Sequence, residues 1–198
     1  MHNINVTNYQ FYLQYLQSHS EEYLALLNDV LINVTCFFRD RDAWEYLASD
    51  IIFKMIANKQ PDESIRVWSA ACASGQEVYS LVILFAEALG IESCLQRVQF
   101  YATDIDKAAI KQARLATYSA TEVAEIPSNL REKYFEQTPQ GYVFHHKLRR
   151  IVVIGHHNLA EDAPMSKIDL LACRNALYVF QSRNSSKSSS ALSFCSKR

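Results

Sequence analysis

The sequence SAACASGQE, residues 69–77, joins an apolar run, Ile65 to Trp68, to a helical pattern that continues from Val78 to Leu89. This order predicts a strand, a tight turn and a helix. The turn is rich in small side chains, which let a backbone approach a bound molecule closely. The N-terminus of the following helix favours electron-rich groups. The segment therefore has the layout of a ligand-binding turn.

A second strand is predicted over residues 97–103, and it ends directly before Asp104. An acidic residue that closes the second strand is what a Rossmann-like site uses to hold ribose hydroxyls. The turn lacks the GxGxxG pattern of dinucleotide sites, which favours a smaller cofactor. The two features together predict a pocket for an adenosine-containing cofactor.

Composition narrows the class of protein. A chain of 198 residues accommodates one α/β core but not a second full domain. The formal net charge of −1 gives no indication of a nucleic-acid partner. No apolar stretch reaches the ~18 residues of a membrane span, and the N-terminus lacks the pattern of a signal peptide. The five cysteines form no CxxC pair. We expect a reduced, cytoplasmic protein that does not insert into membranes.

The pattern along the chain predicts three regions. Residues 1–60 form an N-terminal helical segment, with two short helices within residues 8–32 and a third over residues 40–58. Residues 61–180 form the α/β core. Its expected strands are 65–70, 97–103 and 168–173, and its expected helices are 77–89, 106–117 and 128–137.

A small insertion is expected near the end of the core, and a serine-rich segment follows the core. Short strands are expected at residues 142–144 and 150–154 around a turn near Lys147, forming a small antiparallel β-element at about residues 141–155. Residues 181–198 contain eight serines and little periodicity, which predicts a disordered tail. The C-terminal strands of the sheet are thus expected to be missing, which leaves an open edge.

The segment NVTCFFRD, residues 33–40, has two interpretations. Asn33 or Thr35 caps the next helix while Arg39 forms a surface ion pair. Alternatively, the segment is a loop over the pocket that offers amide, hydroxyl and guanidinium groups to a ligand carboxylate.

Several further polar residues follow predicted strands or open predicted helices. Glu77 is either a partner of the helix dipole or an acceptor for a ligand amine or hydroxyl. Asp106 is the expected helix cap, which leaves Asp104 for the ligand. Asn158 could hydrogen-bond an adenine edge. It follows the pair His156-His157, which lacks the spacing of metal ligands, so no metal site is expected.

Six segments occur in one order along the chain: NxTxFFR (33–39), VWSA (67–70), ASGQEVYS (73–80), ATDID (102–106), HNL (157–159) and CRN (173–175). In these segments the chain resembles CheR-type chemotaxis receptor methyltransferases, from about Leu31 to Phe180. The resemblance implies an α/β fold, with a Rossmann-like class I methyltransferase sheet and flanking helices. The cofactor of that family is S-adenosylmethionine (SAM), and its product is S-adenosylhomocysteine.

The resemblance also implies site residues. Ala71 stands where the family usually has glycine. Arg39 is expected to act in catalysis by orienting a carboxylate. The family usually has a tyrosine at the position of Val179, and Tyr178, one place earlier, is the candidate here. The cofactor-binding residues implied are Asn33, Thr35, Arg39, Ala71, Glu77, Asp104, Asn158, Leu159, Arg174 and Asn175.

The activity implied is transfer of a methyl group from SAM to glutamate side chains of a chemoreceptor-like signalling protein, giving glutamate methyl esters. The partner implied is the cytoplasmic domain of such a receptor, on which the β-element docks in some family members. The alternative is a catalytically impaired module that binds SAM or S-adenosylhomocysteine. An NAD-linked oxidoreductase is disfavoured by the sequence of the turn.

Overall fold

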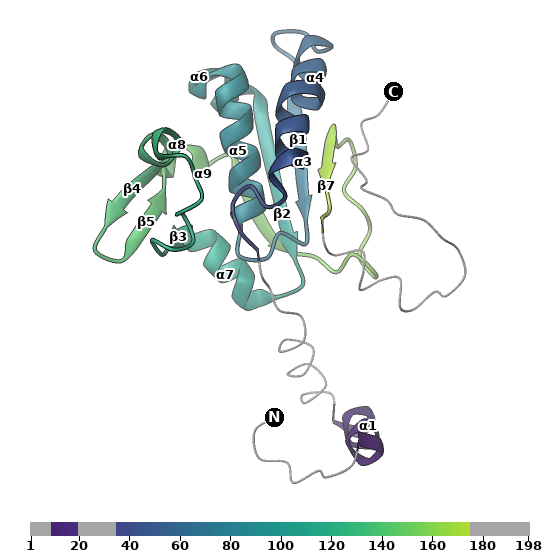
Figure 1. Ribbon diagram of the computed structural model, residues 1–198. Helices are drawn as coiled ribbons and strands as arrows, with labels where there is room; N and C mark the ends of the chain where they lie inside the picture. Colours follow the sequence, from purple (N-terminus) through teal and green to yellow (C-terminus); the bar gives the residue numbers. More distant parts are fainter. Residues whose placement is uncertain (1–8, 20–34, 175–198) are drawn as a thin grey trace. The chain divides into compact units, whose positions relative to one another are not determined.

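The structure is a computed structural model that describes residues 9–19 and 35–174 (Figure 1). The chain divides into two compact units, Met1–Val34 and Thr35–Arg198. In the first unit, helix α1 spans Tyr9–Ser18 and matches the first of the two expected N-terminal helices. The second expected helix lies outside the described residues.

The second unit alternates helices and strands. Their order is α3 (Arg41–Tyr46), the π-helix η1 (Leu47–Ile52), α4 (Phe53–Ala57), β1 (Ile65–Ala70), α5 (Gln76–Leu89), α6 (Ile91–Arg97), β2 (Val98–Asp104), α7 (Lys107–Leu115), β3 (Thr117–Tyr118), α8 (Ser128–Tyr134), β4 (Phe135–Thr138), β5 (Gly141–Phe144), α9 (His146–Arg149), β6 (Val152–His156) and β7 (Leu170–Ala172).

The main sheet is parallel, with strand order β6-β2-β1-β7. The chain steps from β1 to β2 to β6 in one direction across this sheet, and right-handed crossovers therefore place α5 and α7 on the same face. Helix α5 packs against β1 and β2, and α7 packs against β2 and β6. The predicted α/β Rossmann-like sheet is confirmed.

The hydrophobic core lies between α5 and the sheet. Ile65 and Val67 of β1 and Phe100 of β2 have no exposed surface. Phe85 of α5 meets Phe100 edge to face, with ring centroids 5.6 Å apart. Burial of this apolar surface provides the main driving force for the two layers to associate. The core thereby fixes the strand ends from which the site is built.

A second, antiparallel sheet has the order β3-β5-β4 and lies beside the main sheet (Figure 1). Its aromatic cluster consists of Tyr118, Tyr134, Phe135 and Phe144, none more than 5% exposed. The expected antiparallel element therefore exists, but its predicted boundaries at about 141–155 are wrong. Residues 146–149 form α9 instead of a turn, and β6 pairs with β2 in the main sheet.

The end of helix α8 and the pairing of strand β6 differ from the prediction for physical reasons. The helix predicted over residues 128–137 ends at Tyr134, because Phe135 turns into the aromatic cluster and begins β4. The apolar run at 150–154 suits a hairpin strand and a buried parallel strand equally well. Its partner, β2, lies about 50 positions earlier in sequence, beyond the reach of local pattern.

The far edge of the main sheet is β7, which pairs only with β1 within residues 35–174. The serine-rich tail, residues 181–198, lies outside the described residues. In the described segments no single helix has both the length and the apolar composition to cross a membrane; only α5 and α6 taken as a bent pair pass by those two criteria.

Gly75 provides a test of the packing between α5 and its surroundings. Its φ is +96°, and a Cβ there would lie 3.0 Å from the Cβ of Ala113 and 3.1 Å from atoms of Tyr79 and Tyr118. Gly90 also has a positive φ, +79°, but nothing lies within 4 Å of an added Cβ. Alanine would strain the backbone at both positions, and more so at Gly90, where φ 79° is combined with ψ 150°, whereas crowding is specific to Gly75.

We therefore expect Gly75→Ala to lower the free energy of unfolding by about 1–3 kcal/mol more than Gly155→Ala does, because Gly155 has neither a positive φ nor any atom within 4 Å of an added Cβ. Urea unfolding of the two variants measures the difference. Equal losses would show that neither strain nor crowding at Gly75 lowers the stability.

Candidate functional site

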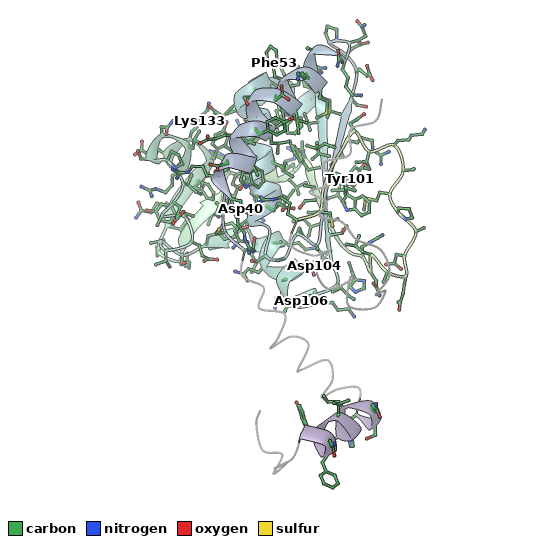
Figure 2. The ribbon with its side chains drawn as sticks, turned by 45° about the vertical axis from the view of Figure 1, so that its right-hand side comes forward. Asp40, Phe53, Tyr101, Asp104, Asp106 and Lys133 are labelled. Atoms are coloured by element: carbon green, nitrogen blue, oxygen red, sulfur yellow. The ribbon has the colours of Figure 1, made fainter. Side chains whose placement is uncertain are left out.

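The carboxyl ends of the four parallel strands bring together five of the site residues expected from the sequence. Ala71 follows β1, Asp104 ends β2, Asn158 and Leu159 follow β6, and Arg174 follows β7. In open parallel sheets this edge is where ligands bind. In Figure 2, Asp104 lies toward one end of the core and Phe53 toward the opposite end.

The turn after β1 has an unusual backbone. Ala71, Ala73 and Gly75 have φ values of 58°, 46° and 96°. These left-handed conformations disfavour large and β-branched side chains, which explains the small residues of the turn. The turn is held by a hydrogen bond from Cys72 N to the carbonyl oxygen of Thr103, 3.0 Å long. Its backbone is thus bent without bulky side chains in the way of a ligand.

Asp104 connects this turn to two other segments. It is 8% exposed, and its Oδ2 accepts a 2.8 Å hydrogen bond from Ala73 N. Its Oδ1 accepts from Asp106 N at 2.9 Å, and its carbonyl oxygen accepts from His157 N at 3.0 Å. A carboxylate has about four acceptor positions, so these contacts leave capacity for a ligand hydroxyl. Asp106 caps α7 by accepting from Ala108 N, as the sequence predicts.

Glu77 lies in the first turn of α5, and its Oε1 accepts a 2.7 Å hydrogen bond from Ser69 Oγ. Burial raises the pKa of Glu77 to about 7, although the Ser69 hydroxyl and the charges of Arg174 and Arg39 oppose this rise in pKa. The charged form is therefore incompletely stabilised by the protein alone. A ligand that brings a donor or a positive charge would complete its stabilisation.

The segment before α3 folds as a loop onto α5 and the small sheet. The phenyl ring of Phe37, 2% exposed, packs edge-on against Tyr118 and Phe135. The next residue, Phe38, donates from its backbone N to Ser80 Oγ at 3.1 Å. The N-cap position of α3 is Asp40, so Thr35 does not cap this helix.

Within this loop, the carbonyl oxygen of Arg39 accepts two side-chain donors. Trp44 Nε1 lies 2.6 Å away and Arg174 Nη2 lies 2.7 Å away. The same Arg174 nitrogen contacts Asp40 Oδ2 at 2.5 Å, and the guanidinium lies over the Trp44 ring. Phe38 and Asp40 both have positive φ values, and these contacts hold that strained backbone in place. We call these contacts the Arg39 clamp.

Asp40 and Trp44 are members of this clamp that the sequence did not indicate. Both lie within the helix expected over residues 40–58, for which no such role was predicted. Trp44 is indeed 4% exposed, but its indole nitrogen also has a specific partner. The residue type of Trp44 was the one signal in the sequence for this contact. The indole N–H of a buried tryptophan needs a hydrogen-bond acceptor.

The remaining expected residues divide into two groups. Asn158 forms a local turn, in which its N donates to Asp162 Oδ2 and its Oδ1 accepts from Ala160 N. Asn33, Asn175 and Tyr178 lie outside the described residues. Across the described segments, no group of three His, Cys, Asp or Glu side chains could hold a metal ion.

The raised pKa of Glu77 makes a stability prediction. Between about pH 4.5 and pH 7 the native state binds more protons than the unfolded state, so this residue reduces stability as pH rises through that range. Glu77→Gln removes the charge and should raise the free energy of unfolding at pH 8 by about 1–3 kcal/mol, with little effect at pH 4. Denaturant unfolding at both pH values measures this, and Glu92→Gln, at an exposed position of α6, is the control. A gain in Glu92→Gln of the same size would refute the assignment to Glu77.

Comparisons with known proteins identify relatives of this chain. The sequence model of the CheR methyltransferase SAM-binding domain matches residues 33–193. The chain is 33% identical over 170 residues to the "Uncharacterized 104.1 kDa protein in hypE 3'region" of Rhodobacter capsulatus, covering 86% of this chain and 18% of that protein. It is 31% identical to the chemotaxis protein methyltransferase of Listeria innocua, covering 81% and 58%, and 31% identical to chemotaxis protein methyltransferase 2 of Vibrio cholerae, covering 87% and 62%.

The chain thus spans less than two thirds of the length of these relatives. The match to the family model nevertheless includes the turn, both acidic positions and the Arg39 loop. The chain belongs to the CheR methyltransferase family and carries its SAM-binding domain.

Proposed function

We propose that this chain transfers the methyl group of SAM to glutamate side chains of a chemoreceptor-like signalling protein. One observation carries the proposal: Asp104 binds the small-residue turn, Glu77 begins the helix that follows the turn, and the charges of Arg39 and Arg174 act on Glu77. The family supports SAM as the cofactor, and relatives named chemotaxis protein methyltransferase support the substrate class.

The residues present fit SAM group by group. Asp104 has acceptor capacity for ribose hydroxyls, as acidic residues at this position of Rossmann-like sheets do. Glu77, whose carboxylate is incompletely stabilised, suits the ammonium group of the amino-acid portion. Arg39 suits a carboxylate, either that of SAM or that of the incoming glutamate, and Asn158 suits an adenine edge. Ala71 keeps the turn open at its start.

The remaining assignments have less support from contacts. Thr35 and Leu159 flank these residues in sequence, and Arg174 acts through its hold on Arg39. Asn33, Asn175 and Tyr178 stay predictions from the resemblance.

The chemistry requires little acid–base assistance. Bound SAM supplies a methyl group on a positively charged sulfur. A glutamate with an ordinary pKa near 4.3 is already ionised at neutral pH, so the site need not remove a proton from it. The task of the protein is to hold the carboxylate in line and exclude water, and such positioning provides roughly 7–11 kcal/mol. Because opposite charges cancel as the reaction proceeds, a dry site favours it.

The proposed partner is the cytoplasmic domain of a chemoreceptor, and the proposed location is the cytoplasm. The support is the substrate class named for the relatives. The formal net charge of −1 matches a protein partner better than a nucleic acid.

Methyl transfer from labelled SAM to receptor fragments, together with calorimetric SAM titration, tests the proposal. Asp104→Asn should weaken SAM binding at least about tenfold, because it removes a charged acceptor. Asp106→Asn retains the cap and should bind SAM as the unchanged chain does. SAM binding without any methyl transfer would make the chain a binding module. SAM binding that is indifferent to Asp104→Asn would refute the site.

Arg39→Ala should reduce methyl transfer much more than it reduces SAM affinity, because we assign its guanidinium to orienting the incoming carboxylate. Single-turnover rates and calorimetric affinities separate the two effects. Arg41→Ala, at the exposed start of α3, is the control and should change neither. Equal losses of rate and affinity in Arg39→Ala would mean that Arg39 binds only the cofactor.

A further inference from the structure

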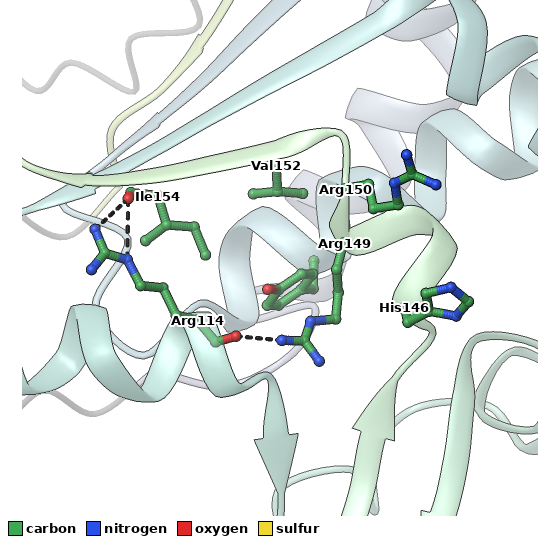
Figure 3. A pocket seen from close by; sticks show the side chains of 7 residues that line it. Arg114, His146, Arg149, Arg150, Val152 and Ile154 are labelled. Carbon is green, nitrogen blue, oxygen red and sulfur yellow. Dashed lines mark hydrogen bonds between the residues drawn. The ribbon is translucent and has the colours of Figure 1, made fainter.

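Two of the three arginines in the cavity between α7, α9 and β6 hold backbone carbonyl groups (Figure 3). Arg114 donates from Nε and Nη2 to the carbonyl oxygen of Ile154, at 3.3 and 2.8 Å, and Arg149 Nη2 donates to the carbonyl oxygen of Arg114 at 2.6 Å. The guanidinium of Arg150 points away from these two. The positive charges of Arg114 and Arg149 thus serve the fold, in contrast to the negative charge of Glu77.

The hydroxyl group of Ser69 contacts Glu77 from within the main sheet. Ser69 lies in β1 and pairs with Ala102 of β2 on one side and with Ala172 of β7 on the other. Its side chain is fully buried, and its Oγ donates to Glu77 Oε1 at 2.7 Å. A close-packed residue between two paired strands has little freedom to move. The hydroxyl is therefore a fixed donor that acts on Glu77 and does not itself reach a ligand.

Glu77, unlike Ser69, is accessible to a ligand, because it is only partly buried. Ser69 binds its Oε1, whereas its Oε2 accepts no hydrogen bond from residues 35–174. Within the same residues Glu77 forms no salt bridge. One carboxylate oxygen is thus held by the protein, and the other has acceptor capacity for a ligand.

The hydroxyl at Oε1 is the strongest of the groups that favour the charged form of Glu77. Burial raises the pKa of Glu77 to about 7, and that hydroxyl, followed by the charges of Arg174 and Arg39, opposes the rise. Two thiols respond to Glu77: burial and, to a smaller extent, the charge of Glu77 raise the pKa of Cys72 and of Cys173. Both thiols therefore stay neutral near pH 7 and add no charge beside Glu77.

We propose that Ser69 is a positioning residue whose hydroxyl keeps Glu77 ionised and orients it toward a primary ammonium group of the ligand. The inference rests on the proposed function, in which this ammonium belongs to SAM. A hydrogen bond to the charged form of a carboxylate favours that form. An arginine or lysine in place of Ser69 would also favour it but would neutralise the carboxylate. A hydroxyl leaves the negative charge for the ligand, and its fixed place in β1 limits the orientations that Glu77 adopts.

Carbon-13 NMR titration of the glutamate carboxyl groups in the full, ligand-free chain tests the effect of Ser69 on Glu77, with Glu77→Gln to assign the signal. Ser69→Ala should raise the pKa of Glu77 by about one unit, because hydrogen bonds to charged groups are among the stronger ones. Ser69→Thr retains the hydroxyl and should leave this pKa unchanged. The matched control is Thr103→Val, which removes a buried hydroxyl of the same sheet that bonds to Trp68 Nε1. It should not change the pKa of Glu77.

Calorimetric SAM titration at pH 7, in two buffers of different ionisation enthalpy, tests the link to the ligand by counting the protons released on binding. With a pKa of about 7, Glu77 is half protonated before binding, so the unchanged chain should release ~0.5 proton from it. Ser69→Ala should release nearly one and should bind SAM about fivefold more weakly, because less of the free chain carries the ionised Glu77. Any proton exchanged by SAM itself is the same for both chains.

Ser69→Cys keeps the test available if Ser69→Ala fails to fold, because a thiol is a similar-sized but weaker donor and should also raise the pKa of Glu77. Three results would overturn the proposal: an unchanged pKa of Glu77 in Ser69→Ala and Ser69→Cys, an equal rise in Thr103→Val, or equal proton release from Ser69→Ala and the unchanged chain. Failure of the unchanged chain to bind SAM would refute the proposed function, whereas the hold of Ser69 on Glu77 is decided by the ligand-free titration.

Discussion

The carboxylate of Asp104 is the contact on which the site geometry depends most. One oxygen holds the turn after β1 through Ala73 N, and the other holds the entry to α7 through Asp106 N. The carbonyl of the same residue holds the segment after β6 through His157 N. Three chain segments thus meet at one residue. An acidic residue here is therefore required by the fold as well as suited to a ligand, and the two roles are compatible because a carboxylate accepts several hydrogen bonds at once.

The Arg39 loop is held by contacts from distant parts of the chain. Phe37 anchors it in the aromatic cluster of the small sheet, and Arg174 and Trp44 fix its carbonyl oxygen. The left-handed backbone at Asp40 costs energy that these contacts offset. The small antiparallel sheet therefore supports the carboxyl edge of the main sheet, and a change in its aromatic packing would reach Arg39 through Phe37.

Local pattern predicted the elements that are set by local physics. Strand β1 and helix α5 follow from periodicity, and the cap at Asp106 follows from residue type and position. Local pattern could not predict the features that depend on contacts between distant parts of the chain. The pairing of β6 with β2 and the hold of Arg174 on Arg39, 135 positions away, leave no local signature. The family resemblance identified Arg174 as important, but its partners became visible only in the fold.

The formal net charge of −1 conceals a separation of charge within the fold. Glu77 lies at the carboxyl edge of the sheet with a pKa raised to about 7, which means that its charge lacks sufficient compensation. Arg149 and Arg150 line a cavity that contains no acidic residue. If folding stability alone had shaped this chain, Glu77 would have a closer positive partner or be replaced by a neutral residue. A buried charge left in this way is typical of a binding site that receives a ligand of opposite charge. Residues that reduce the stability of the fold are found most often where function requires them. The ammonium group of SAM suits the site at Glu77.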